Sequence, residues 1–175
     1  MSNKAINNSA PQQQGPGYHI NKIVKGVVGE SSKIYEELQE IEDSENQNVR
    51  IMVLVELADM YGSIQRYLEK HFSDVTMEDL KQRSQDTNYC RKRIRKNISG
   101  TSKIIRKEIR AFQLAERQGI LNKLTARNKL ARVYGAMELY LRSNFPGIYF
   151  TDMTDADLRA MSIVTRRVFE NGHRS

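Results

Sequence analysis

Hydrophobic residues recur at helical spacing along most of this 175-residue chain. One stripe consists of Ile34, Leu38 and Ile41. Steps of three and four residues place such side chains on one face of an α-helix. No stretch alternates between apolar and polar residues as a strand does, so the predicted fold class is all-α. A second stripe has the members Val53, Leu57, Met60, Ile64 and Leu68.

Turn-forming and capping residues divide this pattern into helices. The sequence DSENQN at 43–48 separates the first two helices and is short enough to make them antiparallel neighbours. Thr76, followed by two acidic residues, is the predicted N-cap of a third helix. NISGTS at 97–102 ends that helix and begins a fourth. A fifth helix is expected over about 125–143, and a last one after a cap at Thr154.

One stretch of the chain occurs twice. ELADMYGSIQRYLEKHF (56–72) aligns without gaps to KLARVYGAMELYLRSNF (129–145), with seven of seventeen positions identical. The tripeptide SKI at 32–34 likewise returns at 102–104. These matches predict two degenerate three-helix repeats that pack about an internal pseudo-two-fold axis, as identical chains do in a homodimer. A resemblance by helical composition alone is the alternative.

The repeat defines the predicted domain organisation. Residues 18–96 form the first repeat and residues 97–175 the second. The polar stretch 1–17 lacks the apolar core of a signal peptide and is interpreted as a disordered tail.

Acidic residues recur at i,i+3 spacing on both helices of the first repeat. Glu37 and Glu40 share one helix face, and Glu56 and Asp59 share a face of the next helix. Four carboxylates brought together repel one another unless a cation lies between them. Mg²⁺ binds through a few carboxylates together with phosphate oxygens, and it can activate a bound water. A solvated helix face is the competing interpretation.

The second repeat carries bases where the first carries acids. The SKI alignment sets Glu36, Glu37 and Glu40 opposite Arg106, Lys107 and Arg110. The longer alignment sets Glu56 and Asp59 opposite Lys129 and Arg132. The second repeat is therefore expected to keep the fold without the metal. These five cations, with Lys33, are candidate anion or phosphate ligands, and we expect something negative to face them, either an anion or the acidic first repeat.

The sequences EELQE (36–40) and ELAD (56–59) resemble the E-E-x-x-E…E-x-x-D signature of the MazG-like, all-α nucleoside triphosphate pyrophosphohydrolases. GVVGESSKIYEELQEIED is similar to the bacteriophage-encoded members in particular. The resemblance covers roughly 18–90 and, more weakly, the C-terminal helix. It implies cleavage of a nucleoside triphosphate substrate between the α and β phosphates, with Mg²⁺ or, as a substitute, Mn²⁺. Family enzymes work as dimers or tetramers, which implies a homo-oligomer.

The same resemblance assigns roles to individual residues. The metal ligands carry over onto Glu37, Glu40, Glu56 and Asp59. Glu36 becomes an outer ligand or the base that activates water.

Charge is distributed unevenly and supports a rival function. Residues 30–59 hold nine acids against two bases, whereas residues 91–132 hold fourteen bases against two acids. A catalytically inactive descendant could bind nucleic acid or a protein through the basic half. That half lacks interleaved aromatic residues, so nucleic acid is the weaker alternative. A purely structural interaction module is the third.

Other residues suggest no further chemistry. The single cysteine, Cys90, excludes an internal disulfide and favours a reducing, cytoplasmic location, in a host cell if the protein is phage-encoded. The longest apolar run, 51–55, is too short to cross a bilayer, so no membrane association is expected. We interpret Cys90 as a structural thiol, and His19, His71 and His173 as surface residues.

Overall fold

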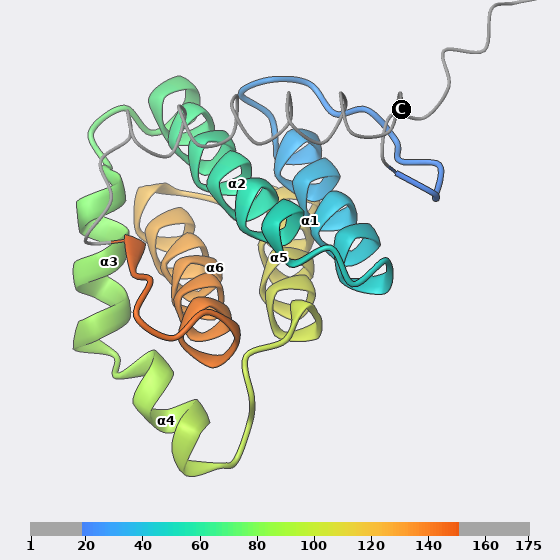
Figure 1. Cartoon of the computed structure of the whole chain (residues 1–175). Helices are drawn as coiled ribbons and strands as arrows, with labels where there is room; N and C mark the ends of the chain where they lie inside the picture. Colours follow the sequence, from blue (N-terminus) through green and yellow to red (C-terminus); the bar gives the residue numbers. More distant parts are fainter. Residues whose placement is uncertain (1–18, 151–175) are drawn as a thin grey trace, which may run out of the picture.

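The computed structural model describes residues 19–150, and this part of the chain folds into helices and loops without strands (Figure 1). The expected all-α class is confirmed for this range. The predicted tail at 1–17 and the helix expected after Thr154 lie outside it. The helices are α1 (Ser31–Asn46), α2 (Arg50–His71), α3 (Met77–Asp86), α4 (Tyr89–Arg95), α5 (Ser102–Arg117) and α6 (Lys123–Asn144).

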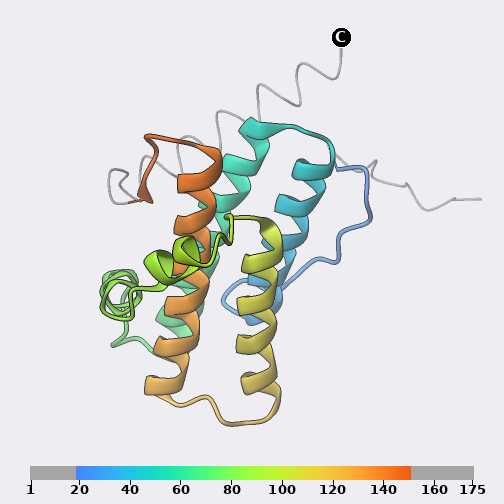
Figure 2. The ribbon, with the colours of Figure 1, turned by 90° about the horizontal axis from the view of Figure 1, so that it is seen from below.

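Two helical hairpins form the body of the molecule. Helices α1 and α2 pack along each other, as do α5 and α6, and α1 lies against α5 (Figures 1 and 2). Helix α3 packs on α6, and α4 contacts both α3 and α6. The ranges 18–96 and 97–175 therefore pack into each other within the described residues, since α3 belongs to the first range and covers a helix of the second.

The hydrophobic stripes of the sequence form the core. Ile34, Leu38 and Ile41 of α1 are fully buried, and Ile105 and Phe112 are buried in the same way on α5. Burying a side chain of this size contributes about 1.5–3 kcal/mol. The periodic positions thus explain why α1 and α5 face each other through their apolar stripes.

Helix α1 continues through part of the predicted turn. The expected turn at 43–48 is wrong over its first four residues, because α1 runs to Asn46 and the chain reverses at 47–49. Asp43 is buried within the helix, and its carboxylate accepts hydrogen bonds from the backbone N–H groups of Ile20 and Asn21, both at 3.1 Å. These partners come from a segment more than 20 residues earlier in the sequence, so the turn propensity of residues 43–48 could not predict them.

The predicted third helix is broken into two. Thr76 caps α3 as expected and forms a capping box with Asp79. Asn88 then adopts a left-handed conformation with φ 51°, so α3 ends and α4 starts in a new direction. A Cβ atom at Gly135 of α6 would lie 2.6 Å from both Ser84 Oγ and a Tyr89 ring carbon. The absence of a side chain at Gly135 therefore lets α3 and α4 approach α6 closely.

The two hairpins have matching dimensions and matching contacts. Helices α1 and α5 both contain 16 residues, and α2 and α6 both contain 22. The Tyr140 hydroxyl of α6 donates to Glu45 of α1 at 2.7 Å, and the Tyr67 hydroxyl of α2 donates to Glu116 of α5 at 2.9 Å. The serines that begin the two shorter helices donate to the same carboxylates, Ser102 to Glu45 and Ser31 to Glu116.

The register of these matched helices corrects the alignment made on SKI. The fourth residues of α1 and α5 are Ile34 and Ile105, and both are fully buried. Ile34 therefore corresponds to Ile105, one residue later than the SKI alignment placed it. Glu37 and Glu108 are then the seventh residues of their helices, and Lys107 no longer falls opposite Glu37. The inference that every acid of the first repeat became a base is wrong at this position.

Candidate metal centre

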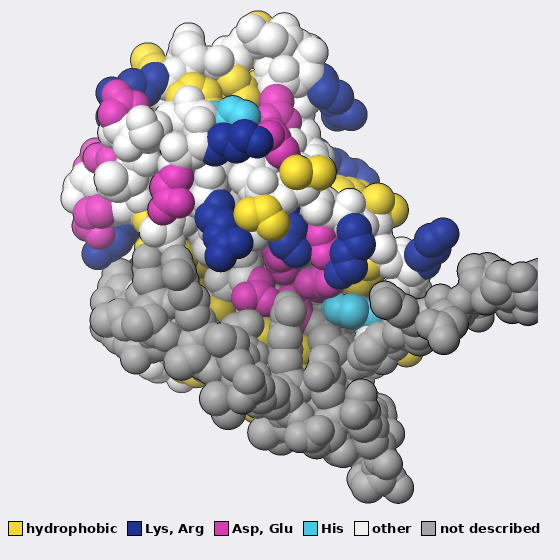
Figure 3. Space-filling model, turned by 90° about the horizontal axis from the view of Figure 1, so that it is seen from above, with side chains coloured by type: hydrophobic (Ala, Val, Ile, Leu, Met, Phe, Trp, Pro, Cys, Tyr) yellow, Lys and Arg dark blue, Asp and Glu magenta, His cyan; other side chains and the backbone are white. Residues whose placement is uncertain are grey.

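The antiparallel pairing of α1 and α2 brings three of the predicted ligands together. Glu37 of α1 and Glu56 and Asp59 of α2 each offer a carboxylate oxygen, and these oxygens all lie within 4.8 Å of one another. Glu37 is 1 % exposed and Glu56 is fully buried. Figure 3 shows acidic side chains gathered on this face, bordered by basic side chains and a histidine.

Glu37 is the most strongly perturbed of these groups. Its Oε1 pairs with Lys33 Nζ at 2.7 Å, whereas its buried Oε2 accepts no hydrogen bond from any residue in 19–150. Burial, together with the negative charges of Glu40 and Asp59, raises the pKa of Glu37 to about 8. An oxygen-lined space with an unsatisfied buried carboxylate oxygen fits a hard divalent cation, because such a cation supplies the missing positive charge.

Glu40 lies on the other side of Glu56 and meets a histidine there. His19 Nε2 is 3.4 Å from Glu40 Oε1, and ligand atoms of His19, Glu40 and Glu56 form a second group within 4.8 Å. Burial opposes ionisation of Glu40, but the hydrogen bond from His19 and the nearby positive charge of Lys25 lower its pKa. The expectation that His19 is an isolated surface residue is therefore wrong, since its side chain is only 16 % exposed.

Sequence reasoning also missed Asp43, which positions His19. His19 Nδ1 lies 3.2 Å from Asp43 Oδ2, beside the two backbone N–H groups that the same carboxylate accepts. A signal was present, because Asp43 continues the i,i+3 series of Glu37 and Glu40 along α1. The sequence spacing does not predict that His19 lies beside Glu40, because His19 belongs to a loop 21 positions earlier in the chain.

Glu36 stands apart from the three-carboxylate group. It receives Lys25 Nζ at 2.8 Å, Lys33 Nζ at 3.1 Å and the Gly26 backbone N–H at 2.6 Å. Burial would raise the pKa of Glu36, but the bonds from Lys25 and Gly26 lower it overall. Glu36 thus anchors the segment 19–30 over α1. A Cβ atom at Gly26 would lie 2.4 Å from Lys33 N, so only glycine permits this approach.

The corresponding place in the second hairpin holds a guanidinium group. Asp59 and Arg132 are the tenth residues of α2 and α6. Arg132 Nε lies 2.8 Å from Glu108 Oε2, and Glu108 also accepts from the Tyr89 hydroxyl at 2.9 Å and from Arg93 at 3.2 Å. Burial of Glu108 is offset by the bonds from Arg132 and Tyr89, so its pKa is lowered.

The five predicted cations do not form one cluster. Arg132 meets Glu108, while Arg106 forms a two-pronged ion pair with Glu42 of α1 and also donates to the Tyr35 hydroxyl. The expectation that negative groups face the bases holds for these two. Lys107 and Arg110 are exposed and Lys129 is half-buried, and none of these three forms a hydrogen bond or ion pair with a residue in 19–150.

Cys90 behaves as a packing residue. It is buried, and its Sγ lies 3.4 Å from the Gly135 carbonyl oxygen. Burial and the charge of Glu138 raise the pKa of the Cys90 thiol to about 12. A thiolate is the nucleophilic form of cysteine, so this environment disfavours nucleophilic chemistry.

Comparison with protein-family models, with curated proteins and with solved structures finds no match to this chain. Among the helices in residues 19–150, none is both long and apolar enough to cross a membrane. Function is therefore argued from the geometry of the carboxylates and of the basic residues.

Proposed function

We propose that this protein is a Mg²⁺-dependent nucleoside triphosphate pyrophosphohydrolase with one metal centre per chain. The observation that carries the proposal is the group formed by Glu37, Glu56 and Asp59, in which a buried Glu37 oxygen lacks a hydrogen-bond donor among the described residues. A solvated helix face would not bury Glu37 and Glu56.

Different residues of the site would bind the metal and the substrate. Glu37, Glu56 and Asp59 would hold Mg²⁺ or Mn²⁺, with Glu40 beside them against His19. A bound ion would supply positive charge to offset a triphosphate and would help to activate water. Lys33 lies at the edge of the group with its side chain partly exposed, and it would contact phosphate oxygens. Glu36 keeps Lys25 and Lys33 in place, which makes it a positioning residue.

We further propose that the chain is a duplicated, MazG-like unit of bacteriophage type. The equal helix lengths support this, as do the paired contacts of Glu45 with Tyr140 and Glu116 with Tyr67. In the second unit the position of Asp59 belongs to Arg132, whose charge meets Glu108 directly. One competent centre per chain follows from this proposal.

The test is release of pyrophosphate from each ribo- and deoxyribonucleoside triphosphate by the purified chain, with Mg²⁺, with Mn²⁺ and with EDTA. Glu56→Gln and Asp59→Asn should each lower the rate by about 100-fold or more, since even outer-sphere changes at metal sites cost 10- to 100-fold. Glu69→Gln removes the same charge from an exposed position of α2 and should leave the rate unchanged. If pyrophosphate is released from none of the nucleotides with either metal, the proposal is refuted.

The second candidate is an inactive descendant that binds nucleic acid or a protein through its basic half. The observation in its favour is the series of exposed bases on α4, which includes Arg91, Lys92 and Arg95. It predicts no hydrolysis, together with DNA or RNA binding whose affinity falls steeply as salt rises.

A further inference from the structure

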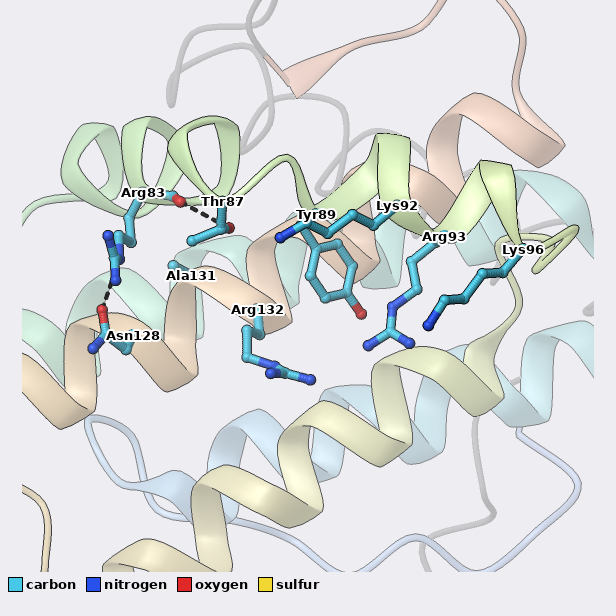
Figure 4. A pocket seen from close by; sticks show the side chains of 9 residues that line it. All are labelled: Arg83, Thr87, Tyr89, Lys92, Arg93, Lys96, Asn128, Ala131 and Arg132. Atoms are coloured by element: carbon cyan, nitrogen blue, oxygen red, sulfur yellow. Dashed lines mark hydrogen bonds between the residues drawn. The ribbon is translucent and has the colours of Figure 1, made fainter.

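A second concave site lies between α3, α4 and α6. It is a pocket of about 360 Å³, and every charged residue that lines it is basic (Figure 4). None of its lining residues belongs to the carboxylate centre. The charged lining residues are Arg83, Lys92, Arg93, Lys96 and Arg132.

A single buried carboxylate fixes two of these cations from behind. Glu108 is 2 % exposed and accepts from Arg132 at 2.8 Å and from Arg93 at 3.2 Å. The Arg93 guanidinium also lies 5.0 Å from the centre of the Tyr89 ring. Each guanidinium has five N–H donors, so both retain donors beyond those that Glu108 engages. The pocket thus presents two pre-positioned arginines.

The other cations have no counter-charge among the described residues. Arg83 Nε donates to the neutral Asn128 amide oxygen at 2.8 Å. Lys92 lies on α4 and Lys96 directly follows its last residue; both are exposed, and neither forms a hydrogen bond or ion pair with any residue in 19–150. Figure 4 shows Lys96 extending toward Arg93 and Arg132, and Lys92 along the rim of the pocket. Like charges that lie close together repel one another, so an anion that joins these cations would lower that repulsion.

We propose that this pocket binds the pyrophosphate or triphosphate group of a small ligand, separately from the metal centre. Arginine binds phosphate oxygens in a bidentate manner, and five cations against one carboxylate match a ligand with several negative charges. Tyr89 is only 6 % exposed, so its ring offers no face on which a base could stack. Recognition is therefore of the phosphates, and a compact pocket suits a short polyphosphate better than an extended nucleic-acid backbone.

Calorimetric titration of the full chain with inorganic pyrophosphate, in EDTA at about 0.1 M salt, tests this without loading the carboxylates with metal. The double variant Lys92→Gln/Lys96→Gln should weaken binding about tenfold or more, since it removes two charge-assisted contacts from exposed positions. Lys103→Gln/Arg117→Gln removes two exposed charges from α5 and should bind within twofold of wild type. Circular dichroism should show both variants folded.

The same titration identifies the source of the phosphate group. A nucleoside triphosphate that binds as tightly as pyrophosphate, or more tightly, supports the site. Absence of pyrophosphate binding, or equal weakening in the two double variants, would overturn it. A 20-nucleotide single strand that binds more tightly than pyrophosphate, through Lys92 and Lys96, would also overturn it in favour of a nucleic-acid surface.

Discussion

At the scale of single residues, the contrast between Asp59 and Arg132 defines the chemistry of the two hairpins. Both occupy the tenth position of a 22-residue helix. Asp59 adds a carboxylate to the group of Glu37 and Glu56, where the proposed function places a metal ion. Arg132 supplies a cation as part of the chain, and the buried Glu108 is satisfied without any ion.

Arg132→Gln should therefore destabilise the fold. Glu108 would keep Tyr89 and Arg93 but lose its closest charged partner. Removing one member of a buried ion pair costs about 3–5 kcal/mol, and because Arg132 is half exposed we expect about 1–2 kcal/mol here. Urea denaturation measures the change. Arg110→Gln, at an exposed position of α5, should stay within about 0.5 kcal/mol of wild type.

The same pair predicts how stability depends on pH. The pKa of Glu108 is lower in the folded chain than the value of about 4.3 for a free glutamate. Its contribution to stability is therefore complete above that value and is lost as the pH falls toward and through the folded pKa. Melting temperatures between pH 7 and pH 3 should fall at the acid end. They should fall less steeply in Arg132→Gln, and an identical slope would contradict the assignment.

Residue types and spacing were enough to predict the acidic group but not its surroundings. Glu37, Glu56 and Asp59 could be found because helical periodicity places them on facing helices. His19 could not, because its position depends on hydrogen bonds between a loop and Asp43. Glu108 was hidden by an alignment that was one residue out of register.

At the scale of helices, the local sequence pattern predicts that a helix exists better than it predicts where the helix begins and ends. The stripes and the Thr76 cap identify the helices, because burial periodicity and capping are properties of short sequences. The break at Asn88 is not such a property. The change of direction there is stabilised by the packing of α3 and α4 on α6 at Gly135.

Gly135→Ala should loosen that seating. The new methyl group would have to displace Ser84 or the Tyr89 ring, and overpacking of this kind costs about 1–3 kcal/mol. Since α3 and α4 supply three of the five bases in the pocket, the variant should also weaken pyrophosphate binding. Denaturation and titration together report both effects. Gln85→Ala, exposed on α3, is the matched surface change, and equal stability of the two variants would argue against this packing.

At the scale of the whole molecule, the hairpins are tied together by two equivalent hydrogen bonds. Tyr67→Phe removes the bond to Glu116, and Tyr140→Phe removes the bond to Glu45. Each change should cost about 1 kcal/mol, the usual net value of one hydrogen bond. The double variant should cost the sum, because distant sites are additive. Unequal single effects, measured by chemical denaturation, would count against the internal symmetry.

The built-in cation of the second hairpin has a consequence for how the chain would respond to its ionic surroundings. Stabilisation by a side-chain cation does not depend on the concentration of ions in solution. Stabilisation by a bound ion grows with the logarithm of the free ion concentration. With Mg²⁺ bound as proposed, a chelator should speed amide hydrogen exchange in α1 and α2 while leaving the inner turns of α5 and α6 protected. The stability of the α1–α2 hairpin would then depend on the divalent-ion concentration, whereas that of the α5–α6 hairpin would not.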